Sequence, residues 1–187
     1  MNRIICIDPG HGKPWPGAVF GFIKESEFVL NIAAHLAGEL QKRGYFVVKT
    51  RYSNFALVSE REKLVEDLNT RAQIANMFKA NIFISLHFNA HENHAANGVE
   101  SWYFQGSVKG RHLAECIQNQ LIKKFKMRNR GIKGTNKLIV LRKTLMPAVL
   151  IELGFISNPK DREIMASSDY PQNAACAIAD GVDSYFQ

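Results

Sequence analysis

Short apolar runs rich in β-branched residues recur along the chain, and their length constrains the fold more than any other feature. The longest, residues 82–86 and 148–151, are strand-sized and almost entirely apolar. Such runs are typical of strands buried on both faces of a sheet. A helix that crosses a bilayer needs about 20 apolar residues, so we expect no membrane insertion.

Segments with helical spacing of apolar residues separate these strands. We expect strands at residues 3–7, 45–50, 82–88, 98–104, 138–141 and 148–153, and helices at residues 28–44, 60–79, 109–127 and 174–186, with a further helix starting at Asn158-Pro159. Strands that alternate with helices predict a three-layer α/β fold, a mainly parallel twisted sheet with helices on both faces. The sequence contains no repeat or linker, so we expect one domain over residues 1–187, and a monomer.

Charge and cysteine content exclude several classes of protein. Lys and Arg total 24 against 17 Asp and Glu, a net charge of +7 that favours polyanionic partners. The sequence has no helix-turn-helix, RNP-like or zinc-finger pattern, so we expect no nucleic-acid partner. Cell-wall polymers with phosphates and carboxylates would attract the same charge. The three cysteines form no CxxC pair, which indicates neither a disulfide scaffold nor a cysteine-based zinc site.

The amino terminus leads directly into the first strand pattern, without the apolar region of a signal peptide. We therefore expect either release by cell lysis or an export signal that is missing from this sequence.

Two of the six histidines lie where a metal ligand is expected. His11 follows the first strand in a loop flanked by glycines, whose small size lets other ligands approach closely. His87 lies near the end of the apolar strand at residues 82–88, where a polar side chain is costly to bury unless it is hydrogen-bonded or bound to a metal.

A carboxylate would complete a zinc site, since catalytic zinc commonly has three protein ligands, and two histidines with one glutamate are an established set. Glu25 and Glu27 both lie at the start of the first long helix. Acidic residues in a first turn also stabilise the helix dipole, so one of the two has that role alone. The periodicity leaves both open as the ligand.

Glu152 interrupts an otherwise apolar strand at residues 147–155. An unpaired carboxylate is costly there, which leaves two interpretations: an ion pair with an arginine, or a partly desolvated carboxylate beside a metal. The second environment suits a group that transfers protons.

The remaining histidines are weaker candidates. His91 is four residues after His87, a spacing that forms a zinc face on a helix, but the strand before it and the polar loop after it argue against a helix. We expect His91 and His94 at the rim of the site. His35 and His112 lie within amphipathic helices and are interpreted as structural.

Three segments together resemble a known family: IDPGHG at residues 7–12, SLHFNA at residues 85–90 and MPAVLIELGFISN at residues 146–158. They resemble the zinc-dependent N-acetylmuramoyl-L-alanine amidases of the amidase 3 family, of the LytC/AmiC type. The three occur in the family's order with its approximate spacing. Residues 98–104 and 129–131 are also similar to family segments, with features of phage endolysin amidase domains.

The resemblance implies a function and assigns the site. It implies that Glu25 joins His11 and His87 as ligands of Zn²⁺ and that Glu152 is the catalytic acid/base. The substrate would be bacterial peptidoglycan, cut at the amide between N-acetylmuramic acid and L-alanine, so that the protein acts at the cell wall. Two alternatives are a zinc peptidase that cuts within the stem peptide and a non-catalytic wall-binding module of the same fold.

Overall fold

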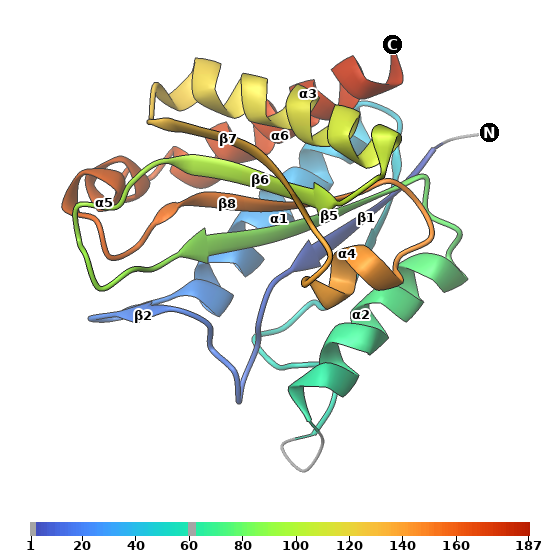
Figure 1. The fold of residues 1–187 in the computed structure, drawn as a ribbon, viewed down its shortest axis with the longest axis horizontal. Helices are drawn as coiled ribbons and strands as arrows, with labels where there is room; N and C mark the ends of the chain where they lie inside the picture. Colours follow the sequence, from blue (N-terminus) through green and yellow to red (C-terminus); the bar gives the residue numbers. More distant parts are fainter. Residues whose placement is uncertain (1–2, 60–62) are drawn as a thin grey trace.

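The structure is a computed structural model, and it describes residues 3–59 and 63–187. Its strands are β1 Ile4–Pro9, β2 Val19–Phe20, β3 Ile23–Lys24, β4 Phe46–Lys49, β5 Ile82–Asn89, β6 Val99–Phe104, β7 Asn129–Thr135 and β8 Ala148–Phe155. Within the described part, six of them form a sheet in the order β4-β1-β5-β8-β6-β7 (Figure 1). Neighbouring strands are parallel except for β6 and β8, which are antiparallel. Strands β2 and β3 form a separate hairpin.

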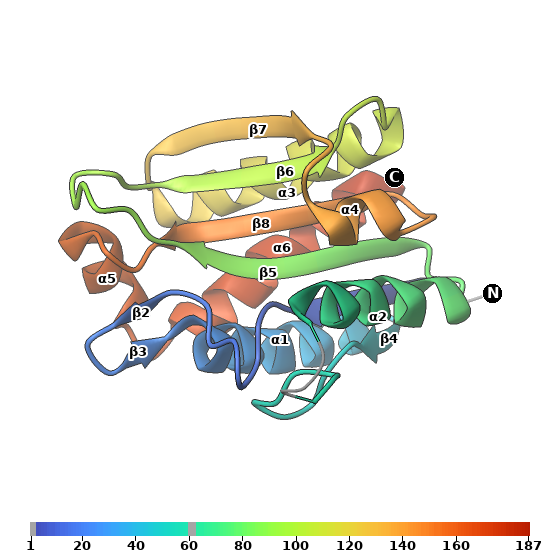
Figure 2. The same cartoon turned by 60° about the horizontal axis from the view of Figure 1, so that its bottom comes forward.

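Helices cover both faces of this sheet. They are α1 Glu25–Lys42, α2 Leu64–Met77, α3 Val108–Phe125, α4 Ile139–Lys143, α5 Pro159–Met165 and α6 Tyr170–Phe186. Figures 1 and 2 show α1, α3 and α6 on one face and α2 and α4 on the other. Helix α5 lies at the end of the sheet where β5 and β8 finish. None of the described helices is both long and apolar enough to cross a membrane.

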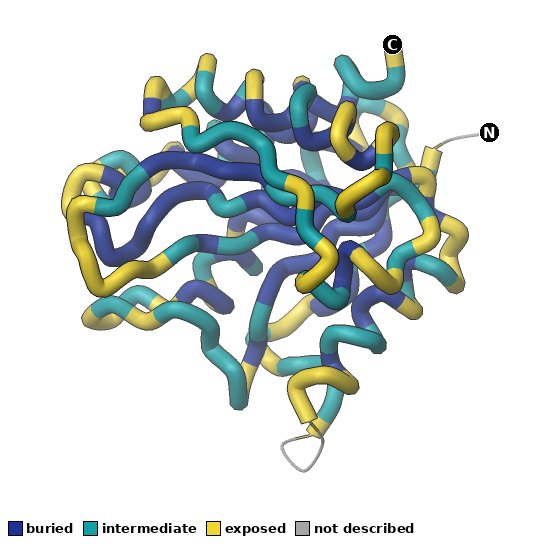
Figure 3. The backbone as a smooth tube through the Cα atoms, in the orientation of Figure 1, coloured by how far each residue is buried: buried dark blue, intermediate teal, exposed yellow. Residues whose placement is uncertain are grey.

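The alternation of side chains along each strand divides the core into two. On β5, Ile82, Ile84 and Leu86 belong to the large core under α1, α3 and α6, whereas Phe83 belongs to the smaller core on the other face. Figure 3 shows that the central strands are buried along most of their length. His87 continues the second set, so it faces the side of α2 and α4.

Strand β8 follows the same rule. Val149 and Ile151 belong to the large core and Leu150 to the smaller one. Glu152 therefore faces the same side as His87, the residue it pairs with across the two strands. Helices α2 and α4 lie over the opposite end of this face, so neither of them covers the face at the carboxyl ends of β5 and β8 (Figure 2).

The structure confirms the three-layer α/β fold and the mainly parallel sheet. The helix expected after Asn158 is present, with the Asn158 side chain accepting hydrogen bonds from the amides of Lys160 and Asp161 and Pro159 in the first turn. The start of the helix expected from residue 60 lies outside the described residues. The single-domain expectation remains a prediction.

One predicted strand is wrong, and three strands were not predicted. Residues 138–141 begin helix α4 instead of forming a strand, because a short apolar run fits either structure and here packs Val140 and Leu141 against the smaller core. Strand β7 contains two glycines and little apolar sequence, so it gives no strand pattern. The β2–β3 hairpin is too short to show alternation.

Candidate functional site

The loop after β1 holds His11 in an unusual backbone conformation. His11 has a φ of 64°, in the left-handed region that few residues other than glycine adopt. A Cβ at Gly10 would overlap the ring of His87, so glycine is needed for the loop to pass this close to β5. Hydrogen bonds from two buried arginines stabilise the loop in this strained conformation.

Arg51 and Arg71 bind the backbone of the His11 loop. Arg71 donates to the carbonyl oxygens of Pro9 at 2.8 Å and His11 at 2.6 Å. Arg51 donates to the carbonyls of Pro9 and Gly10, each at 2.8 Å. Both guanidinium groups are buried, with exposed fractions of 1–2%. These charge-assisted bonds fix the path of the loop.

Asp8 and Asp67 balance the charge of Arg71. Arg71 contacts Asp8 at 2.9 Å and Asp67 at 2.6 Å. Asp8 also accepts hydrogen bonds from the hydroxyls of Thr50 and Ser85. Burial alone would raise the pKa of Asp8, but Arg71 and the two hydroxyls hold it below its usual value. Sequence reasoning missed this network, although an Asp at the end of an apolar strand was a usable indication.

Glu25 is the first residue of α1 and is 2% exposed. Its Oε2 accepts a hydrogen bond from the amide of Ala18 at 2.8 Å, and its Oε1 accepts one from the amide of Phe88 at 3.0 Å. The carboxylate is therefore held from the hairpin side and from β5 at once. Glu27 points away from this position: its side chain is half-exposed and contacts Lys24 at 3.5 Å.

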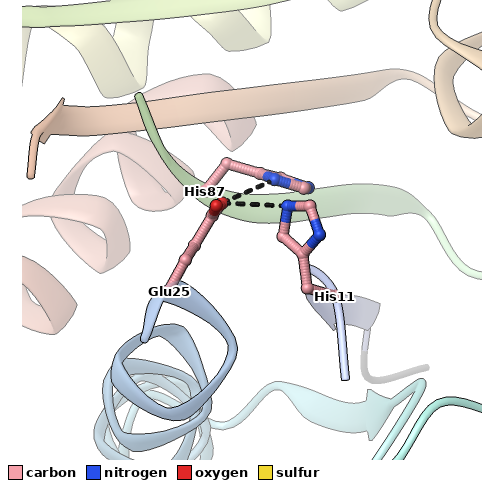
Figure 4. Close-up of side chains that lie close together, drawn as sticks. All are labelled: His11, Glu25 and His87. Carbon is pink, nitrogen blue, oxygen red and sulfur yellow. Dashed lines mark hydrogen bonds and ion pairs between the residues drawn. The ribbon is translucent and has the colours of Figure 1, made fainter. Parts of the chain in front are cut away.

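His11, Glu25 and His87 converge on one point (Figure 4). Glu25 Oε1 lies 3.1 Å from His11 Nε2 and 3.0 Å from His87 Nδ1. One donor atom from each residue lies within 4.8 Å of the other two, close enough to share a metal ion. Burial opposes the charge of Glu25, but the two histidines reverse that effect and hold its pKa well below its usual value. Two imidazole nitrogens and one carboxylate oxygen fit zinc.

Glycine at residue 17 makes room for this arrangement. Gly17 has a φ of 74°, and a Cβ there would overlap both Glu25 Oε2 and the ring of His11. The chain after the His11 loop thus passes directly against two of the three donor residues. This close packing supports a site shaped around the three side chains.

Glu152 lies beside this group without belonging to it. It pairs with His87 across β5 and β8, and its buried Oε2 has no hydrogen-bond partner in the described part of the chain. Burial raises the pKa of Glu152 well above its usual value; the charges of Glu25 and Glu100 raise it further, and Lys133 opposes them. A cation on the three donors would lower this pKa.

Sequence reasoning also missed a group of charged residues next to Glu152. Glu100 on β6 is opposite Glu152 and pairs with Arg130 and Lys133 of β7. The available indication was a glutamate within a strand pattern at residues 98–104.

The other histidines lie away from the three donors. His91 is exposed and its Nδ1 accepts a hydrogen bond from the amide of Asn93. The ring of His94 packs against Phe20 at 5.8 Å, which joins the loop after β5 to the hairpin. Neither is part of the metal-binding group found among the described residues.

Comparison with known proteins decides the family. The family model described as N-acetylmuramoyl-L-alanine amidase, Amidase_3, matches residues 5–184. The chain belongs to this family. Membership confirms the resemblance seen in the sequence and assigns the chain the activity of an N-acetylmuramoyl-L-alanine amidase, a hydrolase of peptidoglycan.

Individual relatives agree with this assignment. The chain is 32% identical over 190 residues to the germination-specific N-acetylmuramoyl-L-alanine amidase of Bacillus subtilis, covering 99% of this chain and 80% of the relative. It is 35% identical to the amidase LytC of Bacillus subtilis, covering 100% of this chain and 36% of LytC. The crystal structure of an N-acetylmuramoyl-L-alanine amidase from Clostridium difficile 630 has a TM-score of 0.87 and 33% identity, covering 99% of this chain and 97% of that one.

Proposed function

We propose that His11, Glu25 and His87 bind a zinc ion and that Glu152 moves the proton in the amidase reaction. The observation that carries this is the contact of both imidazoles with one carboxylate oxygen, at 3.0 and 3.1 Å. This donor set matches catalytic zinc sites, which keep one position open. When bound, zinc supplies Lewis acidity toward a carbonyl oxygen and toward water.

The surroundings of Glu152 support its proposed role as the proton carrier. Its Oε2 has no hydrogen-bond partner in the described residues, so this oxygen can take up a proton. It accepts a proton from water as the water oxygen bonds to the amide carbon, and returns it to the nitrogen of L-alanine as the C–N bond breaks. The products are a lactyl carboxylate on N-acetylmuramic acid and a peptide with a free amino group.

The surroundings orient the donors and limit their movement. Backbone amides of Ala18 and Phe88 hold the Glu25 carboxylate, and Arg51 and Arg71 hold the His11 loop. Groups fixed before substrate arrives need no reorganisation during the reaction. We place the activity at the bacterial cell wall, where the substrate is.

Product analysis on purified peptidoglycan tests the bond that is cut. Mass spectrometry should find muramoyl lactyl groups released from intact stem peptides. Shortened peptides would instead indicate the peptidase alternative, and binding without any product would indicate the wall-binding alternative. A chelator should stop product formation and added Zn²⁺ should restore it; hydrolysis that continues after complete metal removal would contradict the zinc site.

Matched glutamine variants test the separate roles of the glutamates. Glu25→Gln should lose zinc, measured as metal content per protein, whereas Glu27→Gln at the same helix end should keep it. Glu152→Gln should keep zinc and lose hydrolysis. Loss of zinc from a folded Glu152→Gln protein would make Glu152 a ligand and contradict its role as proton carrier.

A further inference from the structure

Glu100 lies next to Glu152 at the open end of the sheet. The two residues are opposite each other in the antiparallel pairing of β6 with β8, so their side chains point to the same face. Glu100 is 4% exposed, and its carboxylate accepts four hydrogen bonds. The donors are Asn89 Nδ2 and Trp102 Nε1, each at 3.2 Å, and Arg130 Nε and Lys133 Nζ, each at 2.6 Å. The carboxylate is therefore fully satisfied within the protein.

Unlike Glu100, the cations Arg130 and Lys133 keep hydrogen-bond donors that the described residues do not use. Arg130 and Lys133 bring two positive charges to the one carboxylate that both of them contact, Glu100. The charge of Lys133 also acts on nearby Glu152, but among the described residues no ion pair joins Glu152 to either cation. Their side chains remain 26% and 33% exposed. Within residues 3–59 and 63–187, the Lys133 ammonium donates to Glu100 alone. An ammonium has three donors, so two point elsewhere.

Aromatic rings hold both cations in place. The Lys133 ammonium lies 5.0 Å from the ring centre of Trp102, and the Arg130 guanidinium lies 4.9 Å from that of Phe155. Contacts of this kind stabilise a cation over an aromatic face. Flexible side chains fixed before binding lose less entropy when a ligand arrives.

We propose that Lys133 and Arg130 form a subsite for a carboxylate on the second residue of the substrate's stem peptide. This rests on the proposed function, because it places the scissile amide at Glu152. The two cations contact only one carboxylate within the described residues, so a second carboxylate can pair with them. A neutral group in the same place would form no such pair, so the subsite discriminates between acidic and amidated peptides.

The spacing of the sheet supports the second residue. Adjacent strands are about 4.8 Å apart, and both cations contact Glu100, one strand beyond Glu152. A carboxylate resting on the cations would lie between one and two strand spacings from Glu152, about 5–10 Å. Two residues of extended peptide span about 7 Å.

Two substrates that differ in one group test this subsite on the zinc-loaded protein. Both are N-acetylmuramoyl dipeptides of L-alanine and glutamate; one has a free α-carboxylate on the glutamate and the other has the carboxamide. The protein should hydrolyse the carboxylate form with a kcat/KM about tenfold higher, a ratio equal to about 1.4 kcal/mol. A ratio near one would overturn the proposal.

Variants assign the preference to residue 133. In Lys133→Met the ratio should fall to about one, whereas Lys133→Arg, which keeps the charge, should retain most of it. Lys123→Met is the matched control, since Lys123 is exposed on α3, on the opposite face of the sheet, and its loss should leave the ratio unchanged. A preference that persists in Lys133→Met would contradict the subsite.

Binding separates this proposal from the proposed function. If neither dipeptide is hydrolysed, the proposed function fails, and calorimetric titration of both compounds into the zinc-loaded protein then decides the subsite. Tighter binding of the carboxylate form, lost in Lys133→Met, would support the subsite independently. Equal binding of the two would overturn it.

Discussion

A methyl group at residue 17 should push apart two of the proposed metal ligands, His11 and Glu25. Gly17 has a φ of 74°, and a Cβ there would overlap Glu25 Oε2 and lie 2.6 Å from His11 Cδ2. Glu25 cannot retreat without loss, because the same Oε2 accepts a hydrogen bond from the amide of Ala18. The Gly17→Ala substitution should therefore displace the carboxylate, the imidazole or both.

The expected cost has two parts. A non-glycine residue in the left-handed region costs about 1–2 kcal/mol. Loss of the Ala18–Glu25 hydrogen bond leaves a buried carboxylate oxygen short of a donor, which costs about 1–3 kcal/mol. The metal-free protein should thus lose about 2–5 kcal/mol of unfolding free energy in all. Zinc affinity should fall about 10–100-fold, as when groups that orient a metal ligand are removed.

Gly21→Ala provides the matched control. Gly21 also has a positive φ, of 58°, but a Cβ there meets nothing within 4 Å. It should cost the backbone strain alone and leave zinc affinity unchanged. Urea unfolding of the metal-free proteins and zinc titration against a chromophoric chelator measure the two quantities.

The comparison of the two alanine variants can refute the site. If Gly17→Ala binds zinc as tightly as Gly21→Ala while both are folded, the metal does not depend on the close packing of His11 and Glu25. The ligands would then have to be sought elsewhere in the chain.

Two further predictions concern the buried charges beneath the His11 loop. Arg71→Met should destabilise the protein by about 3–5 kcal/mol, because it leaves buried acids unpaired. The control Arg111→Met breaks the exposed pair with Glu115 and should cost less than about 1 kcal/mol. Similar losses for the two variants in urea unfolding would be evidence against the network. The second prediction concerns pH. Arg71 holds the pKa of Asp8 below its usual value, so ionised Asp8 stabilises the folded protein. This contribution is fully present above the unfolded pKa of about 3.9 and is lost as pH falls through the lower folded pKa. Unfolding free energy should therefore decline below about pH 4, and Asp8→Asn should make that decline shallower; an unchanged slope would rule out this contribution.

The sheet was predictable from local patterns where strands are buried on both faces. Strands β1, β5 and β8 are mostly apolar and contain several β-branched residues, a composition that favours strands over helices. Strand β7 was not predicted because it is an edge strand with a polar, glycine-containing sequence. Helix α4 was mistaken for a strand because packing, which the sequence does not show, decides the form of a short apolar run.

The apolar periodicity of helix α1 distinguishes Glu25 from Glu27 when it is extended back to the start of the helix. Residues on a helix are about 100° apart, so Glu25 shares a face with Val29 and Ile32, four and seven positions later. Both are fully buried in the large core, and Glu25 is buried with them. Glu27 lies about 200° further round and faces solvent. Helix phase alone would have favoured Glu25.

Glu100 could not be placed without the order and direction of the strands. It is the second residue of β6, and in a wholly parallel sheet the start of a strand lies at the end opposite the carboxyl ends of its neighbours. Because β6 is antiparallel to β8, its start instead lies beside the end of β8, and Glu100 is opposite Glu152. β7 runs parallel to β6 and brings Arg130 and Lys133 to the same end. The reversed pair of strands, β6 and β7, thus extends the site beyond the three donors and Glu152, toward the part of the sheet where we place the peptide.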